Sequence, residues 1–330
     1  MTAPIATIIV VTYNSARWFE RQATALAAQT ETRWQLIVID NASAEAERPS
    51  PGALPPGAAL IQNEANIGFA AANNQAARAA STPYLIFLNP DAFPAPEWLA
   101  ALLQTAERHP EGAAIGSTQM RADAPGVFDG VGDVLHASGL AYRAWYGKRH
   151  AAPPPLGESF AACGAAMLVR RDAFEAVDGF DARYFCYFED VDLCFRLRLR
   201  GWGILQAPEA VVAHVGGGSA GARSAFAEFH GARNRLWTFI KCMPGALMWL
   251  LLPAHILATG FVATLAPIRG RGLHAWRGIL AGFADLGPIF ESRRAVQNTR
   301  KSTVFDIAWS LAWSPDVFFT RRAVHRKIRG

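Results

Sequence analysis

The sequence has few of the features that mark several common protein classes. Its four cysteines show neither CxxC nor Cys/His spacing, so we expect reduced, buried thiols and no zinc site. No G-x-G-x-x-G follows the first apolar run, which disfavours a nicotinamide oxidoreductase. That run, residues 5–11, has no basic segment before it and is too short for the core of a signal peptide. We therefore expect the main folded part to be cytoplasmic.

Charged residues are scarce overall and absent from one long stretch. They make up 18% of the 330 residues, against 51% hydrophobic residues, which excludes a disordered or fibrous protein. Residues 242–268 contain no Asp, Glu, Lys or Arg. From residue 269 onward the charge is +8, so the rest of the chain carries −3 of the total +5. A basic tail with tryptophans after an apolar stretch predicts contact with an anionic membrane surface and no nucleic-acid partner.

The apolar stretch is long enough to cross a bilayer. A helix over residues 243–267 would be ~37 Å long, against about 30 Å for the hydrocarbon core. However, Pro253 is expected to divide it, and a single crossing would place the basic tail outside, against the positive-inside tendency. We therefore expect helices that lie in or dip into the cytoplasmic leaflet. Residues 305–319, with Trp309 and Trp313 one turn apart, predict a second interfacial helix or, alternatively, an amphipathic helix packed on the rest of the chain.

The first 120 residues alternate strand-like and helix-like segments, which predicts a parallel sheet with flanking helices. Strands are expected at 7–11, 36–39, 60–61 and 84–88, and helices at 15–29, at 68–80 and from 96. Further strands are expected from 204 and through 211–212, and a helix over 189–200. Ligands of such sheets bind at the carboxyl ends of strands, so the polar clusters that follow them should converge. Residues 120–160 show no period and are interpreted as long loops forming part of a pocket.

Three side chains are candidates for chemistry. Asp91, after a strand, either holds a divalent cation beside a diphosphate or caps the next helix. Asp190, beside Glu189 at a helix start, is either a general base or one of several acids favoured there by the helix dipole. His214 is either a metal ligand or a core histidine. The glycine run 216–218 that follows it either cradles a phosphate or forms a plain loop.

Seven segments, in order, resemble the inverting family 2 glycosyltransferases of the GT-A fold, in particular their bacterial rhamnosyltransferase-like branch. The resemblance runs from about residue 5 to residue 241. The segments are IIVVTYN at 8–14, VIDNAS at 38–43, NEANIGFAAANNQA at 63–76, LNPDA at 88–92, CGAAMLVRR at 163–171, GFDARYFCYFEDVDLCFRLRLRGW at 179–202 and HVGGGS at 214–219.

The resemblance implies an α/β fold of the GT-A type, with a mixed central sheet flanked by helices over residues 1–240. A C-terminal helical, membrane-associated region over 241–330 would follow. Carried over position by position, it also implies a nucleotide site. Thr12, Tyr13 and Asn14 would line the base pocket. Asp40 would accept a hydrogen bond from the base or ribose, with Asn41 and Ser43 beside it. Asn66 and Gly68 would belong to the loop that closes over the nucleotide.

The remaining matches concern the metal and the base. Asp91 matches the last carboxylate of the family's metal-binding motif, and His214 matches a residue that completes the metal or diphosphate site. The first acid of that motif is Asn89 here, a neutral oxygen ligand, which implies a lower metal affinity. Asp190 matches the catalytic base, with Glu189 as its neighbour.

The implied activity is transfer of a sugar, with rhamnose as the first expectation, from a dTDP- or UDP-linked donor, assisted by Mg²⁺ or Mn²⁺. The acceptor would be a hydroxyl of a lipid-linked glycan in cell-surface polysaccharide synthesis. The protein would be peripheral or monotopic on the cytoplasmic face of the inner (plasma) membrane. Two alternatives stay open: the same fold using a UDP-hexose or UDP-HexNAc donor, and a non-catalytic nucleotide-sugar-binding scaffold subunit.

Overall fold

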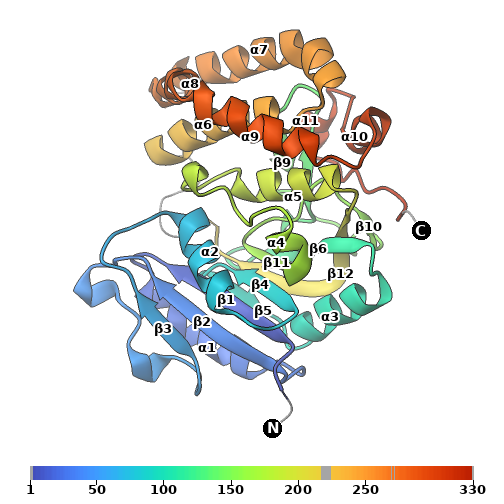
Figure 1. The fold of residues 1–330 in the computed structure, drawn as a ribbon. Helices are drawn as coiled ribbons and strands as arrows, with labels where there is room; N and C mark the ends of the chain where they lie inside the picture. Colours follow the sequence, from blue (N-terminus) through green and yellow to red (C-terminus); the bar gives the residue numbers. More distant parts are fainter. Residues whose placement is uncertain (1–2, 217–223, 269, 271, 329–330) are drawn as a thin grey trace.

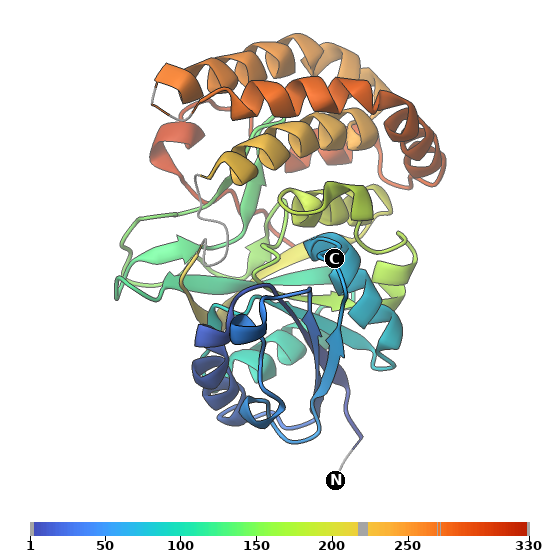
Figure 2. The ribbon, with the colours of Figure 1, turned by 90° about the vertical axis from the view of Figure 1, so that its left-hand side faces the viewer.

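A mixed β-sheet forms one end of the molecule and a layer of C-terminal helices forms the other, with helix α5 (Glu189–Leu199) between them (Figures 1 and 2). The computed structural model describes residues 3–216, 224–268, 270 and 272–328. The predicted α/β class with flanking helices is confirmed.

The main sheet has the strand order β10-β12-β6-β11-β4-β1-β2-β3, with β5 paired to β12 and β7 to β6. A separate small sheet pairs β8 with β9. The strands are β1 (Ala6–Thr12), β2 (Trp34–Asp40), β3 (Ala59–Gln62), β4 (Tyr84–Leu88), β5 (Ala92–Pro94), β6 (Gly112–Arg121), β7 (Phe128–Gly130), β8 (Asp133–Leu135), β9 (Ala141–Arg143), β10 (Gly157–Glu158), β11 (Ala166–Arg170) and β12 (Gly203–His214).

Strand β1 lies inside the sheet because nearly all of its side chains are apolar or β-branched. It is buried along its whole length and pairs in parallel with β2 on one side and β4 on the other. Its last residue, Thr12, pairs with Asp40, the last residue of β2. The loops after β1, β2 and β4 therefore leave the sheet at the same edge, as the sequence predicts.

The helices cover both faces of the sheet and form the C-terminal layer. They are α1 (Phe19–Ala27), α2 (Phe69–Ala79), α3 (Trp98–Arg108), α4 (Arg171–Glu175), α5, α6 (Ala225–Cys242), α7 (Gly245–Ile268), α8 (His274–Ala284), α9 (Leu286–Asn298), α10 (Val304–Ser310) and α11 (Val317–Thr320). Short 3-10 turns occupy Ala16–Trp18, Glu45–Glu47, Pro51–Ala53 and Ala182–Tyr184.

Three local expectations were wrong. Residues 15–29 begin with a 3-10 turn, and the α-helix starts only at Phe19. Residues 203–214 form one long strand, because a register shift between Ala207 and Val211 lets β12 continue along β6. Residues 120–160 contain β7 to β10, which are two or three residues long and therefore too short to show a period.

Pro253 does not divide α7, contrary to expectation. The helix runs unbroken past the exposed proline because the side chains on its other side, including Leu251, His255 and Thr259, pack into the molecule and outweigh the local cost. By length and composition α7 could cross a membrane, and about one third of its most apolar stretch is buried.

Residues 305–319 also differ from the single interfacial helix expected. Helix α10 ends at Ser310 because the next residues are extended: the Ala312 N–H donates to the Leu135 carbonyl, and the Ala137 N–H donates to the Ala312 carbonyl. Helix α11 starts only at Val317. The C-terminal layer is thus tied to the β8–β9 hairpin by backbone hydrogen bonds.

Helices α5 and α6 are joined by a buried ion cluster made of Asp181, Asp192, Arg196 and Lys241. Lys241 Nζ lies 2.7 Å from both Asp181 Oδ2 and Asp192 Oδ1. Arg196 Nε donates to Asp192 Oδ2 at 2.8 Å. Lys241 and Asp192 are almost completely buried. Because each buried charge faces an opposite one, the cluster joins the C-terminal layer to the helix that begins at the functional site.

Candidate active site

A cavity of about 1170 Å³ opens where the loops after β1, β2 and β4 leave the sheet. The start of α5, the end of β12, the β8–β9 hairpin and the first turns of α6 complete its wall. The structure brings eight of the residues chosen from sequence onto this wall: Tyr13, Asn41, Asn66, Asn89, Asp91, Glu189, Asp190 and His214.

The other chosen residues lie behind that wall. Thr12 and Asp40 are buried at the ends of their strands. Asn14 has a left-handed backbone (φ 51), and its N–H donates to Ser43 Oγ at 2.9 Å while its Oδ1 accepts from the Ala44 N–H. Ser43 N–H in turn donates to Asp40 Oδ1 at 3.3 Å. These contacts fix the two loops on which Tyr13 and Asn41 stand.

The loop at Asn66 and Gly68 is held against Asn41. Asn41 Nδ2 donates to Asn66 Oδ1 at 2.8 Å, and the Gly68 N–H donates to the same oxygen at 3.0 Å. Gly68 has a φ of +87, and a Cβ there would lie 2.6 Å from the Phe185 ring. A glycine is therefore required for the loop to pass under the segment that precedes α5.

Asp91 and His214, the two residues expected from sequence to hold a metal, lie next to one another. His214 Nε2 lies 3.4 Å from Asp91 Oδ1 and makes no hydrogen bond within the described residues. On the other side of the ring, Nδ1 lies 2.8 Å from Asp129 Oδ2. This carboxylate–histidine arrangement orients the ring and leaves Nε2 directed at the site, so the donor set fits a divalent cation.

The electrostatics of this pair depend on neighbouring charges. Burial by itself would lower the pKa of His214, but the carboxylates of Asp129 and Asp91 outweigh burial and raise it. Burial would raise the pKa of Asp129, but His214 and the Arg143 guanidinium lower it overall. Asp129 is therefore held as a carboxylate behind the histidine.

Asp190 stands at the first turn of α5 with its carboxylate directed into the cavity. Oδ2 accepts from the Gly164 N–H at 2.8 Å and Oδ1 from the Val191 N–H at 2.8 Å. Both oxygens are thus positioned by backbone donors, and each keeps a second lone pair for a further hydrogen bond. Its neighbour Glu189 is buried, and burial together with Asp190 raises the pKa of Glu189 well above its usual range.

The loop that delivers Asp190 has an uncommon backbone. Phe185, Tyr187 and Phe188 all have positive φ, between 61 and 69. Asn234 of α6 holds this loop, because its Nδ2 donates to the carbonyl oxygens of Tyr184, Cys186 and Tyr187 at 2.7–2.9 Å. The position of Asp190 is therefore set by α6 as well as by α5.

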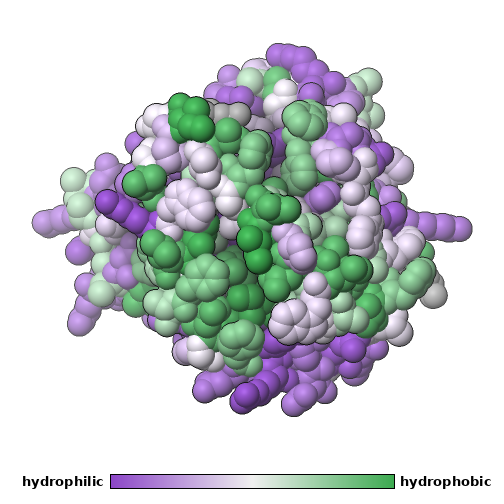
Figure 3. All heavy atoms as spheres, turned by 90° about the horizontal axis from the view of Figure 1, so that it is seen from above, coloured by the Kyte–Doolittle hydropathy of each residue, from purple (hydrophilic) through white to green (hydrophobic). Residues whose placement is uncertain are grey.

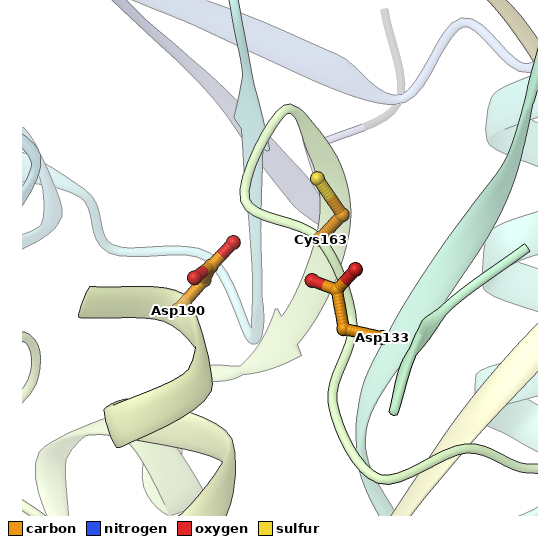
Figure 4. A group of neighbouring side chains, drawn as sticks. All are labelled: Asp133, Cys163 and Asp190. Atoms are coloured by element: carbon orange, nitrogen blue, oxygen red, sulfur yellow. The ribbon is translucent and has the colours of Figure 1, made fainter. Parts of the chain in front are cut away.

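A second group of side chains adjoins Asp190. Figure 4 shows Asp133 and Cys163 turned toward it, and ligand-type atoms of the three residues lie within 4.8 Å of one another. Burial and Asp190 raise the pKa of Asp133 to about 7, and burial raises the pKa of the Cys163 thiol to about 12. Arg143 Nη2 lies 3.1 Å from Cys163 Sγ. A guanidinium beside a protonated thiol disfavours a cation here, so the Asp91–His214 pair fits a metal better.

Sequence reasoning missed Asp129, Asp133 and Arg143. All three come from the stretch without a period, where β7, β8 and β9 carry them to the cavity. The available signal was two isolated acids in an otherwise apolar and glycine-rich run, FDGVGDV. Of the glycine run after His214, Gly216 lines the cavity, and residues 217–218 lie outside the described residues.

Comparisons with known proteins agree with this geometry. The model of glycosyl transferase family 2 matches residues 7–178. An N-acetylglucosaminyl-diphospho-decaprenol L-rhamnosyltransferase of Mycobacterium tuberculosis is 30% identical over 232 residues, which cover 63% of this chain and 75% of that protein.

Two solved structures share the fold. The mannosyltransferase PcManGT from Pyrobaculum calidifontis, in complex with GDP-Man and Mn²⁺, has a TM-score of 0.54 at 19% identity and covers 94% of this chain and 87% of its own. TarS 1–349 of S. aureus has a TM-score of 0.56 at 14% identity, covering 98% and 97%. At these identities the likeness shows the fold alone. Together with the family match, it leads to one conclusion: the chain belongs to glycosyl transferase family 2, a glycosyltransferase of the GT-A fold with rhamnosyltransferase relatives.

Proposed function

We propose that this glycosyltransferase moves rhamnose from a nucleoside-diphosphate donor to a hydroxyl of a lipid-linked glycan, with inversion at the anomeric carbon. One observation carries the proposal: a metal-type pair, Asp91 and His214, and a backbone-positioned carboxylate, Asp190, face the same cavity. In such a cavity one group of side chains can stabilise the leaving group while a different side chain removes the proton of the acceptor.

The donor side is assigned to the loops after β1 and β2. Tyr13 and Asn41 face the cavity, and Thr12, Asn14, Asp40 and Ser43 support them. Asn66 and Gly68 form the loop beside Asn41. The name of the M. tuberculosis relative supports rhamnose as the sugar, and dTDP or UDP as its carrier is our proposal.

The metal is assigned to Asp91 and His214, with Asn89 on the same wall. A bound Mg²⁺ or Mn²⁺ would neutralise charge that develops on the diphosphate leaving group. Asp129 keeps the His214 ring oriented, which makes it a positioning residue. The Mn²⁺ in the PcManGT structure supports a divalent cation of this kind.

The acceptor side is assigned to Asp190. Its carboxylate takes the proton of the acceptor hydroxyl as that oxygen attacks the anomeric carbon, opposite the leaving group. Glu189, whose raised pKa favours its neutral form, adds no second negative charge beside it. Of these two neighbouring acids we therefore assign the role of base to Asp190.

We further propose that residues 1–240 carry the chemistry and residues 241–330 hold the enzyme on the cytoplasmic leaflet, as a peripheral or monotopic protein of the inner membrane. Figure 3 shows apolar side chains gathered over the C-terminal helices. On α7, Trp249, Leu257 and Phe261 are exposed by 69%, 74% and 64%. Their spacing of four or eight residues makes one stripe, opposite the buried side of the helix. Such a stripe fits an interfacial helix.

The activity is tested by release of UDP or dTDP from a panel of nucleotide sugars, with and without Mn²⁺. We expect Mn²⁺-dependent release from dTDP-rhamnose, greatest with a lipid-linked acceptor. Preferred release from a UDP-hexose or UDP-HexNAc would replace the donor proposed here. No turnover and no protection by any donor would favour the scaffold subunit.

Asp190→Asn should lower kcat by more than about 100-fold with donor binding unchanged, because the amide oxygen cannot take the proton. Steady-state kinetics and donor titration measure the two effects. Asp178→Asn, at an exposed acid, is the matched control. Turnover near the wild-type rate in the Asp190 variant would remove this residue from the role of base.

Asp129→Asn should weaken Mn²⁺ binding by about 10- to 100-fold, as expected when the carboxylate behind a ligating histidine is lost. Electron paramagnetic resonance of free Mn²⁺ reports the affinity without any turnover. Glu209→Gln, at an exposed acid of β12, should bind Mn²⁺ like the wild type. Equal affinities in all three proteins would contradict the assignment.

The wild type should sediment with anionic liposomes, and less so in high salt, because the electrostatic part of the attraction is screened. The triple variant Trp249→Ser, Leu257→Ser and Phe261→Ser should stay largely in the supernatant. Ile67→Ser, at an exposed apolar residue near the sheet, is the control and should sediment normally. Equal recovery of all proteins with and without lipid would overturn the membrane proposal.

A further inference from the structure

A buried arginine, with two side-chain nitrogens that have no hydrogen-bond partner among the described residues, lies where α6 meets α7. Arg235 is only 8% exposed, and its Nε and Nη2 atoms make no hydrogen bond within the described residues. No salt bridge of that part of the chain includes it, and burial lowers the pKa of Arg235 to about 10. An uncompensated buried guanidinium is costly, so Arg235 calls for an anion that the described residues do not supply.

Two polar side chains of α7 also have atoms without a hydrogen-bond partner among the described residues, and one of them, His255, has its pKa lowered to about 4 by burial and by the nearby charge of Arg235. Thr259 Oγ1 and His255 Nε2 are buried and make no hydrogen bond within the described residues, whereas His255 Nδ1 lies 2.9 Å from the Ser138 carbonyl oxygen. The Phe239 ring stacks on His255, with centroids 4.0 Å apart, and Ala232 packs in one cluster with Ala263.

These two contacts fix how α6 and α7 lie against one another. Phe239, near the C-terminal end of α6, packs on His255 of α7, whereas the earlier residue Ala232 lies in one cluster with the later residue Ala263. The two helices are therefore antiparallel. Arg235 lies between the two contacts on α6, and Thr259 lies between them on α7. Arg235 and Thr259 thus occupy corresponding positions along the two helices, and both side chains can donate hydrogen bonds.

The site adjoins the active-site cavity. Glu228 and Gly231 of α6 line that cavity, and Arg235 follows Gly231 by one helical turn on the same side. A helical side chain leans toward the N-terminus of its helix, so Arg235 leans toward Gly231. Next to Gly231 there is open space, because no atom lies within 4 Å of the place a Cβ would take.

The other side of the site leads to the apolar face. The buried stripe of α7 that carries His255 and Thr259 is backed by the exposed stripe of Trp249, Leu257 and Phe261. An acceptor whose lipid lies in the membrane and whose sugar lies in the cavity would place its linking group between these two regions.

We propose that Arg235, together with Thr259, binds the diphosphate that links the lipid of the acceptor to its sugar. This inference rests on the proposed lipid-linked acceptor and names the part of it that this site holds. The planar guanidinium offers two parallel donors that match the oxygens of a phosphate group. The hydroxyl of Thr259 adds a third donor, and no carboxylate of the described residues competes through an ion pair with Arg235.

Binding of farnesyl diphosphate tests the site without any turnover. Isothermal titration should show farnesyl diphosphate binding to the wild type, inorganic pyrophosphate competing with it, and farnesol binding at least about tenfold more weakly. Arg235→Gln should weaken the binding of farnesyl diphosphate by about tenfold or more and leave the binding of farnesol unchanged. Arg294→Gln, at an exposed arginine of α9, is the matched control and should bind like the wild type.

If Arg235 had a purely structural role, its replacement would lower the Tm. If it is a binding residue, the opposite is expected. Removing a buried charge that has no partner should leave the Tm unchanged or raise it, so Arg235→Gln should be at least as stable as the wild type. A lower Tm with unchanged farnesyl diphosphate binding would overturn the proposal. Displacement of farnesyl diphosphate by phosphatidylglycerol vesicles, with no effect of pyrophosphate, would also overturn it and assign the site to a membrane phospholipid.

The rate of donor hydrolysis without acceptor separates this inference from the proposed function. Arg235→Gln should release nucleotide at the wild-type rate, because Arg235 is not among the residues assigned to the donor and does not line the cavity. No nucleotide release by either protein, with binding of farnesyl diphosphate still dependent on Arg235, would contradict the proposed function alone. Wild-type release by both, with farnesyl diphosphate bound equally, would contradict the site alone.

Discussion

The pairing of Lys241 with Asp181 and Asp192 is the interaction on which the rest of the structure depends. It is buried, so each of its charges has lost most of its hydration and is tolerated only because the opposite charge is 2.7 Å away. Asp192 lies two residues after Asp190, and Lys241 lies two turns after Asn234 on α6. Helix α6 therefore fixes both α5 and the loop before it. Lys241 holds α5 through its ion pair with Asp192, and the amide of Asn234 holds the loop.

Much of this arrangement follows from local sequence patterns. The apolar runs of β1, β2 and β4 identify buried parallel strands, and parallel strands bring the residues after them to one edge. For this reason Tyr13, Asn41, Asn89 and Asp91 could be expected together before the structure was known. Glu189 and Asp190 could be expected at a helix start because acids favour that position.

What the sequence did not reveal depends on contacts between distant residues. Asp129, Asp133 and Arg143 stand on strands of three residues that exist only because they pair with one another and with β6. The break after α10 arises from hydrogen bonds between Ala312 and the β8–β9 hairpin, and no local signal records that partner. The predicted division of the helix at Pro253 was wrong for the same reason, because the packing of the opposite side of α7 outweighs the local cost of the proline.

The β8–β9 hairpin connects the cavity to helix α7. Its strands carry Asp133 and Arg143 into the cavity, whereas its tip touches His255 of α7 through the carbonyl of Ser138. The residue pairs Asp133–Arg143, Val134–Tyr142 and Leu135–Ala141 join its two strands, so the tip and the side chains in the cavity belong to one hydrogen-bonded unit. The packing of α7 against the Ser138 carbonyl and the position of Asp133 beside Asp190 therefore depend on the same hairpin.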